Sequence, residues 1–290
     1  MKENTDNGHF RTLQQQELDG AALYNKIARF TKNDSERETL LTISRDEYKH
    51  AAIFGKYSKC TLKPNRFRVT FFAFAARVLG YTFIIKLLEQ GEEQSIGAYQ
   101  AEINQIPELN DILRDEETHE NKLLNILDED RLHYVGDIVL GMNDALVELT
   151  GALAGYTLAM QNTTVIAMAG LITGISATLS MAASGYLSSR EAGRKDAAKA
   201  SAYTGLAYLI TVVLLIVPYL LFPVNGYLWA LGVTLVVALS IIAGFNFYIS
   251  VAKGRPFRRS FFVMAGISMG VAAISFFVGL FVKNVLGIKL

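Results

Sequence analysis

The chain has 290 residues, 51% of them hydrophobic, and its 28 basic and 27 acidic residues leave a net charge of +1. This balance, without a long basic run, gives no indication of nucleic acid as a partner, and the single cysteine, Cys60, excludes an internal disulfide framework. Most charged residues precede Tyr134. This uneven distribution predicts two domains, over residues 1–134 and residues 135–290. The helical patterns along the chain make the expected fold all-α, with a four-helix bundle in the first domain and a five-helix membrane domain in the second.

The first predicted helix carries a stripe of residues at helical spacing, namely Glu17, Ala21, Tyr24 and Ala28. Positions three, four and seven apart share one face of a helix, so Glu17 points inward among apolar side chains. A lone carboxylate is costly there, which makes Glu17 a candidate metal ligand. Tyr24 either lies beside that metal or simply packs in the core.

The second predicted helix opens at Ser35-Glu36-Arg37-Glu38, a pattern that fits a capping box. The segment that contains this helix is predicted to end at Lys63-Pro64-Asn65. Glu47 and His50 form a Glu-x-x-His motif on this helix, which brings a carboxylate and an imidazole to one face.

The segment from Arg66 to Arg77 occupies the place of the long crossover between the second and third helices of such a bundle. It is too aromatic and too basic for an exposed crossover. One hypothesis is that it lies on the membrane surface or packs between two copies of the chain. The alternative is that it forms a hydrophobic N-terminal extension of the third helix.

The second half of this domain repeats the pattern of the first. Glu92 precedes Tyr99 by the same seven residues that separate Glu17 from Tyr24, and a second Glu-x-x-His follows at Glu116 and His119. Glu89 is close enough to compete with Glu92 for the same role. Tyr99, like Tyr24, is either a neighbour of the metal or a packing residue.

Two single glutamates and two Glu-x-x-His motifs on four helices are the ligand set of a dinuclear carboxylate site. Clustered carboxylates repel one another unless divalent cations neutralise them, and oxygen with imidazole ligands suits two iron or manganese ions. We expect Glu47 and Glu116 to bridge the ions. The predicted ligands are Glu17, Glu47, His50, Glu92, Glu116 and His119.

This pattern resembles the ferritin-like superfamily, and especially rubrerythrin-like domains, over Gln14 to Leu127. The resemblance implies a di-iron bundle. The Cys-x-x-Cys pairs of a rubredoxin module are missing from the chain, so electron delivery of the rubrerythrin kind is not expected.

Five apolar stretches follow, each long enough to cross about 30 Å of hydrocarbon as a helix. They cover residues 138–160, 165–188, 202–222, 226–251 and 260–282. Lys and Arg gather in the second-to-third and fourth-to-fifth loops and are missing from the other two. By the positive-inside rule, the N-terminal domain is cytoplasmic and the C-terminus lies outside a multi-pass cell (inner) membrane protein.

The first apolar stretch contains Asp144 and Glu148, four residues apart on one helical face. Ionisable groups inside a membrane are expensive and usually mark an ion or proton path. Met181, in the second stretch, would favour a transition metal over Mg²⁺ or Ca²⁺ if its thioether lay beside these carboxylates.

The segments Asp137–Glu148 and Ser180–Ser188 resemble the vacuolar iron transporter family. The resemblance implies five spans, a homodimer, and exchange of Fe²⁺ for protons, with Asp144 and Met181 as pore ligands and Asp137 near the cytoplasmic mouth. At a position where that family has a further acidic residue, this chain has Thr173. The family's long cytoplasmic insert is absent.

Together, the two halves resemble bacterial membrane-bound ferritins. The resemblance implies an exporter of Fe²⁺, or of Mn²⁺, that exchanges the metal for protons and carries a cytoplasmic di-iron domain that binds, oxidises or senses the metal. The alternative is a membrane-anchored di-iron ferroxidase or peroxidase whose spans are mainly an anchor.

Overall fold

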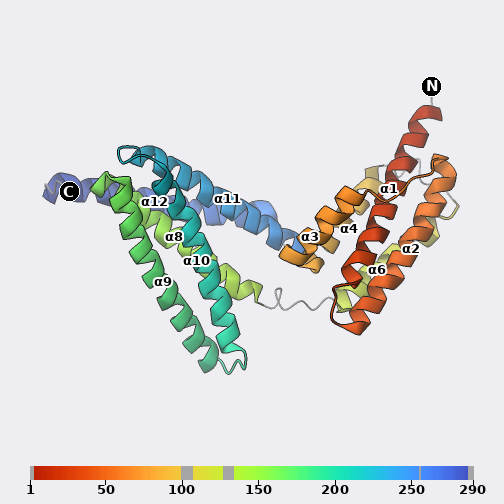
Figure 1. Cartoon of the computed structure of the whole chain (residues 1–290), viewed down its shortest axis with the longest axis horizontal. Coiled ribbons are helices and arrows are strands. Elements are labelled where there is room, and N and C mark those ends of the chain that lie inside the picture. The colour runs from red at the N-terminus through yellow and green to blue at the C-terminus, as the bar shows by residue number, and fades with distance from the viewer. Residues whose placement is uncertain (1–2, 99–106, 127–133, 255, 287–290) are drawn as a thin grey trace. The chain divides into compact units, whose positions relative to one another are not determined.

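A computed structural model of the chain describes residues 3–98, 107–126, 134–254 and 256–286. Within these ranges every regular element is an α-helix, as the sequence predicts (Figure 1). The helices are α1 Glu3–Ala28, α2 Asp34–Ser58, α3 Arg66–Leu79, α4 Tyr81–Ala98, α6 Leu109–Ile126, α8 Val135–Met160, α9 Thr163–Glu191, α10 Ala197–Leu221, α11 Tyr227–Lys253 and α12 Phe257–Leu286.

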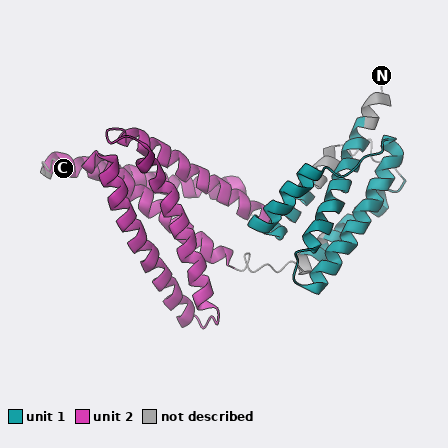
Figure 2. Ribbon diagram, viewed as in Figure 1, with its two compact units in different colours: residues 1–130 teal, residues 131–290 magenta. Residues whose placement is uncertain are grey.

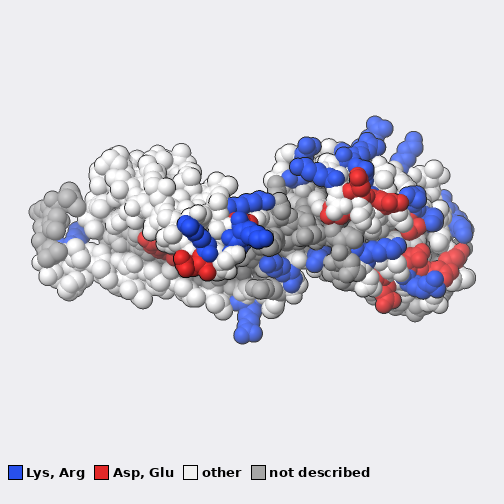
Figure 3. Space-filling model, turned by 90° about the horizontal axis from the view of Figure 1, so that it is seen from below, with Lys and Arg blue, Asp and Glu red and all other residues white. Residues whose placement is uncertain are grey.

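The helices form two compact units, Met1–Asp130 and Arg131–Leu290 (Figure 2). Charged side chains are spread over the visible face of unit 1, whereas most of the visible face of unit 2 is uncharged (Figure 3). The predicted boundary, between residues 134 and 135, borders the segment 127–133, which is outside the described residues. That boundary therefore stays a prediction.

Helices α1 and α2 form an antiparallel pair in unit 1. Their shared interface is apolar and fully buried at Ile27, Leu40 and Ile43. The hydroxyl of Ser44 on α2 donates to the carbonyl oxygen of Ala21 on α1 at 2.7 Å. Burying these aliphatic side chains removes their apolar surface from water, which is the main source of stability for the pair.

The predicted capping box at Ser35 is wrong. Asn33 caps α2, because its side-chain oxygen accepts hydrogen bonds from the backbone N–H groups of Ser35 and Glu36. Its side-chain amide also donates to Glu36 at 3.2 Å. The helix begins at Asp34, so Ser35 already lies in the first turn, where its own N–H is one of the groups that need a cap.

Helix α3 fills the crossover position and is separate from α4. Gly80 lies between the two helices with a φ of 99°, a conformation that favours glycine. This turn excludes the alternative in which residues 66–77 extend the third bundle helix as one continuous helix. Asn65 caps α3 by accepting hydrogen bonds from the N–H groups of Phe67 and Arg68.

Helix α6 runs antiparallel to α2. Glu108, just before α6, binds Lys56 near the end of α2, whereas His119, deep in α6, lies beside Asp46 at the middle of α2. The C-terminus of α6 therefore points to the end of the bundle where α2 begins. Tyr81, the first residue of α4, donates to Glu36 at that same end.

Among its described residues, unit 2 contains five helices long and apolar enough to span a membrane, which confirms the predicted number. They are α8, α9, α10, α11 and α12, each slightly longer than its predicted stretch. The chain is thus a multi-pass membrane protein in which α8 packs against α9, α10 and α12.

Two close crossings set the packing of α8. A Cβ atom at Gly141 would lie 2.2 Å from the carbonyl oxygen of Thr204 on α10, and one at Gly279 on α12 would lie 2.4 Å from the carbonyl oxygen of Gly155 on α8. Only glycine allows the backbones to approach this closely. The small residues Gly141 and Gly155 therefore serve packing within one chain.

Candidate metal centre

The predicted inward stripe of α1 is buried in the structure. Glu17 is 5% exposed and Tyr24 is 4% exposed, with Ala21 and Ala28 between and beyond them. The helical spacing in the sequence is what aligns them on the face of α1 that packs against α2. A carboxylate so far from water needs cationic or hydrogen-bonding neighbours.

The two Glu-x-x-His motifs lie on α2 and α6. Glu47, His50 and His119 are each nearly fully buried, and the Glu116 side chain is 26% exposed. The imidazole ring centres of His50 and His119 are 6.1 Å apart. The antiparallel packing of α2 on α6 thus brings together motifs that are about 70 residues apart in the sequence.

Four of the predicted ligands form one compact group. Single ligand atoms from Glu17, Glu47, His50 and Glu116 all lie within 4.8 Å of one another. His50 Nδ1 is 3.1 Å from Glu116 Oε1, 3.7 Å from Glu47 Oε2 and 3.8 Å from Glu17 Oε2. Three carboxylates and one imidazole around one point form a site for a divalent cation.

The carboxylates of Glu47 and Glu116 each face both histidines. His119 Nδ1 is 3.5 Å from Glu47 Oε1 and 3.8 Å from Glu116 Oε2, which are the oxygens that do not face His50. Each carboxylate therefore offers one oxygen to each histidine. If two ions were bound, Glu47 and Glu116 could therefore each contact both of them.

Several ligand atoms lack hydrogen bonds within the described part of the chain. These buried atoms are Glu47 Oε2, His50 Nδ1 and His119 Nδ1. A buried polar atom without a partner is costly, and a metal ion held between these atoms would satisfy them. The donor set therefore fits two divalent cations.

The field of the carboxylates favours positive charge at this place. Burial alone lowers the pKa of His50, but the carboxylates of Glu116 and Glu47 outweigh it and raise that pKa to about 10. The same two glutamates raise the pKa of His119 to about 10. Without metal the imidazoles are protonated at neutral pH, so cation binding must displace protons.

Two aspartates that the sequence interpretation missed orient the histidines. Asp46 Oδ2 lies 3.3 Å from His119 Nε2, and Asp115 Oδ2 lies 3.4 Å from His50 Nε2. Each aspartate faces the histidine of the opposite helix and leaves its Nδ1 directed at the glutamates. The signal was present in the sequence, since an Asp directly precedes the Glu of both motifs.

The positions of the remaining predicted residues of this centre are only partly described by the structure. The side chain of Glu92 on α4, and the whole of Tyr99, lie outside the described residues. Glu89 is partly buried on α4. The choice between Glu92 and Glu89, and the role of Tyr99, therefore stay predictions.

Changing Asp46 and Asp115 together to Asn is expected to weaken metal binding in unit 1 by about 10- to 100-fold, because the imidazoles lose the groups that fix their orientation. Metal titration of the purified full-length protein measures this change. Asp34→Asn is the matched control, because the Asp34 side chain is 86% exposed at the start of α2. Unchanged affinity in the double variant would show that the two aspartates do not position the histidines.

The membrane unit carries a second set of acids on α8. Asp144 and Glu148 both point out of the single chain, one turn apart. The hydroxyl of Tyr208, a fully buried residue of α10, donates to Glu148 Oε2 at 2.9 Å. Met181 on α9 packs against the buried cluster that contains Tyr208.

Asp137 and Thr173, the other two positions singled out in the membrane unit, each contact a side chain of the same chain. Arg194 binds both carboxylate oxygens of Asp137, at 3.1 and 3.2 Å, and also binds Asp196. Arg194 was not among the predicted site residues. Thr173, at the position of the missing family acid, lies 3.1 Å from the hydroxyl of Tyr156.

The fold and these acids define a helical membrane protein with ionisable groups in its first span. Residues 135–195 match the model of the VIT family. No curated protein and no solved structure matches the chain. The match covers α8 and α9 and supports a VIT-like membrane domain and, with it, transport of a metal.

Proposed function

We propose that the protein exports Fe²⁺ from the cytoplasm in exchange for protons, with Mn²⁺ as the second candidate cargo. The observation that carries this proposal is the pair Asp144 and Glu148 on one face of a span, inside the segment that matches the VIT family. Unit 1, with its paired Glu-x-x-His motifs, is the cytoplasmic site that takes up the metal. By the positive-inside rule, unit 1 and the basic loop at Arg194 lie on the cytoplasmic side of the cell (inner) membrane.

The exposure of the two acids supports a homodimer. Carboxylates cannot face hydrocarbon without a large cost, yet Asp144 and Glu148 lie on the outer face of the single chain. A second copy that covers this face would enclose four carboxylates in one path. Met181, which packs against the cluster that contains Tyr208, would add a thioether if it reached this path, and a thioether favours a transition metal.

Proton exchange supplies the driving force. Moving two positive charges outward against about 100 mV costs about 4.6 kcal/mol. Inward movement of two protons for each Fe²⁺ cancels this term. Carboxylates suit the exchange, because they bind either a metal ion or a proton.

The resident ions of unit 1 are proposed to be two iron or manganese ions. When bound, such ions can supply redox and Lewis-acid chemistry, including oxidation of Fe²⁺. The chain's own part is to bind them through Glu17, Glu47, His50, Glu116 and His119, and to hold the imidazoles through Asp46 and Asp115. Whether Glu92 or Glu89 completes the set is decided by metal analysis of the two single variants.

The proposal is tested with proteoliposomes that contain the full-length protein. Fe²⁺, Mn²⁺ and Zn²⁺ flux is measured together with internal pH, with and without an imposed pH gradient. Metal flux accompanied by proton counterflow supports the exchanger. Oxygen consumption without any metal flux would instead identify a membrane-anchored ferroxidase or peroxidase.

Arg194 gives a separate prediction at the cytoplasmic end of α8. Because its guanidinium occupies both oxygens of Asp137, it competes with a cation that approaches this carboxylate. Arg194→Gln is expected to lower the KM for Fe²⁺ by about fivefold, the effect of removing one competing partner from a partly exposed pair. Flux measurements against Arg190→Gln, an exposed arginine at the end of α9, provide the control. An unchanged or higher KM would show that Asp137 does not receive the metal.

A further inference from the structure

Helix α3 has two opposite apolar faces. One face is buried against the bundle and consists of Val69, Ala73 and Ala76. The other is a stripe of large side chains at positions four, three and four apart. This exposed stripe consists of Phe67 (82% exposed), Phe71 (58%), Phe74 (67%) and Val78 (52%).

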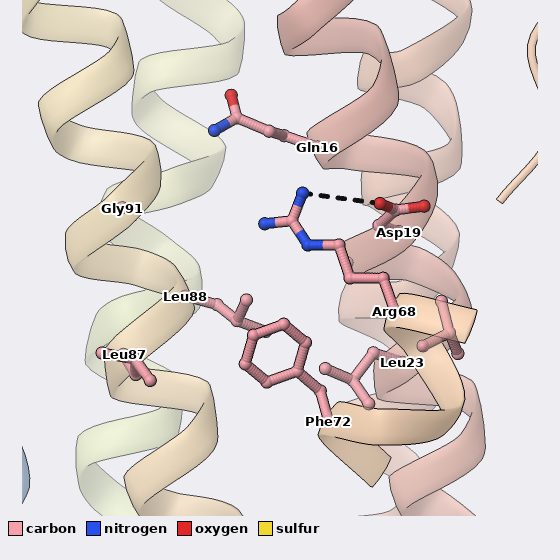
Figure 4. Close-up of a pocket in the computed structure, with 10 residues that line it drawn as sticks. Gln16, Asp19, Leu23, Arg68, Phe72, Leu87, Leu88 and Gly91 are labelled. Atoms are coloured by element: carbon pink, nitrogen blue, oxygen red, sulfur yellow. Dashed lines mark ion pairs between the residues drawn. The ribbon is translucent and has the colours of Figure 1, made fainter. Parts of the chain in front are cut away.

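The exposed stripe belongs to a firmly held helix. Asp19 on α1 accepts a hydrogen bond from the N–H of Asn65, the residue that caps α3, at 2.7 Å. Arg68 forms an ion pair with the same Asp19 (Figure 4). Figure 4 also shows Arg68 and Phe72 directed into a pocket of about 120 Å³ between α1, α3 and α4. These contacts fix which face of α3 points outward.

The charged residues of α3 itself are all basic. The sequence between Glu47 and Glu89 contains eight Lys or Arg residues and no Asp or Glu. Arg66 and Arg77 are exposed, and on a helix they lie on one flank of the stripe. Two copies of α3 packed face to face would place these arginines together without an acidic residue on either helix to pair them.

The position of α3 in the bundle also favours a membrane. The C-terminal end of α3 leads through Gly80 to Tyr81, which binds Glu36 at the end of the bundle toward which α6 runs. Nine residue steps after α6 ends at Ile126, the chain enters its first span at Val135. The covalent connection from unit 1 to the first span therefore leaves from this end, and its nine steps reach no more than about 30 Å even when fully extended.

We propose that α3 is an interfacial helix that lies in the surface of an anionic lipid bilayer. Its exposed stripe enters the boundary between headgroups and acyl chains, and Arg66 and Arg77 bind lipid phosphates. A large apolar face with arginines beside it is the pattern of helices that lie in the membrane plane. This inference goes beyond the proposed transport function and does not depend on it.

The test uses the full-length protein with Cys60, its one cysteine, changed to Ser. Phe71→Cys places an environment-sensitive fluorophore on the stripe, and Asn110→Cys places it at the exposed start of α6, the opposite end of that helix from the membrane tether. The protein is reconstituted into phosphatidylcholine vesicles with or without phosphatidylglycerol. Quenching by phosphatidylcholine that carries a nitroxide on its acyl chain is then measured.

We expect strong quenching at position 71 and none at position 110 in the anionic vesicles. Arg66→Gln and Arg77→Gln should each lower the ratio of docked to undocked helix by about fivefold. A label at 71 that is shielded from water but not quenched by lipid would show that a second copy or another protein covers the stripe, and would overturn the proposal. A label as exposed to water as that at position 110 would also overturn it, and equal docking in neutral vesicles would refute the role of the arginines.

Discussion

Asp144→Asn is expected to reduce metal flux by about two to four orders of magnitude while leaving metal binding in unit 1 unchanged. The substitution keeps the size of the side chain but removes its charge and its ability to carry a proton. In the proposed dimer a second copy covers this face, so the cation would lose a desolvated partner, and losing one partner of a buried ionic contact costs about 3–5 kcal/mol.

The measurement for Asp144→Asn is initial Fe²⁺ flux into or out of proteoliposomes, with metal content of the purified protein as the second readout. Glu191→Gln, at the exposed end of α9, is the matched acidic control and should transport normally. Normal flux in Asp144→Asn would show that the spans do not conduct metal through this carboxylate. Oxygen consumption without metal flux, in the variant and in the unchanged protein alike, would instead support the anchored-enzyme alternative.

Glu47→Gln is expected to remove most of the metal from unit 1. Its two oxygens face the two histidines at 3.7 and 3.5 Å, so one substitution affects both halves of the centre. Bound metal should fall from about two ions per chain to fewer than one, and any oxygen consumption with Fe²⁺ should stop. Transport should weaken but persist, because the path through α8 is intact.

Metal analysis and oxygen uptake of the full-length protein check the Glu47 prediction. Glu38→Gln, an exposed glutamate on the same helix, is the control and should keep its metal. If Glu47→Gln retains two ions, the pair of Glu-x-x-His motifs does not form a dinuclear site. If transport stops entirely, metal must bind to unit 1 before it can cross the membrane, and unit 1 does more than raise the rate of transport.

Periodic patterns in the sequence predicted the features that depend on local geometry. The five spans follow from length and hydropathy alone, and the Glu-x-x-His spacing placed His50 beside Glu47 on one face of α2. Their meeting with Glu116 was inferred because two half-patterns repeat, and the structure places the Glu116 carboxylate 3.1 Å from His50. The first two predictions need only the length and period of one helix, whereas the meeting with Glu116 rests on the ligand set of paired Glu-x-x-His motifs.

Contacts across helices could not be predicted in the same way. Tyr208 beside Glu148 and Arg194 beside Asp137 depend on how α8 packs against later parts of the chain, and no spacing rule encodes that packing. The start of α2 was misplaced for a different reason. Asn33 and Ser35 are both good capping residues, and the choice between them depends on where the turn after α1 ends.

The exchanged pairs Asp46–His119 and Asp115–His50 fix how far α2 and α6 can slide along each other. Apolar side chains tolerate a shift of one helical turn, because one leucine can replace another in a groove. A shift of α6 by one turn, about 5.4 Å, would separate both polar pairs at once. The two aspartates that orient the imidazoles therefore also disfavour a bundle in which α6 is shifted along α2. The same contacts serve both correct folding and the geometry of the ligands.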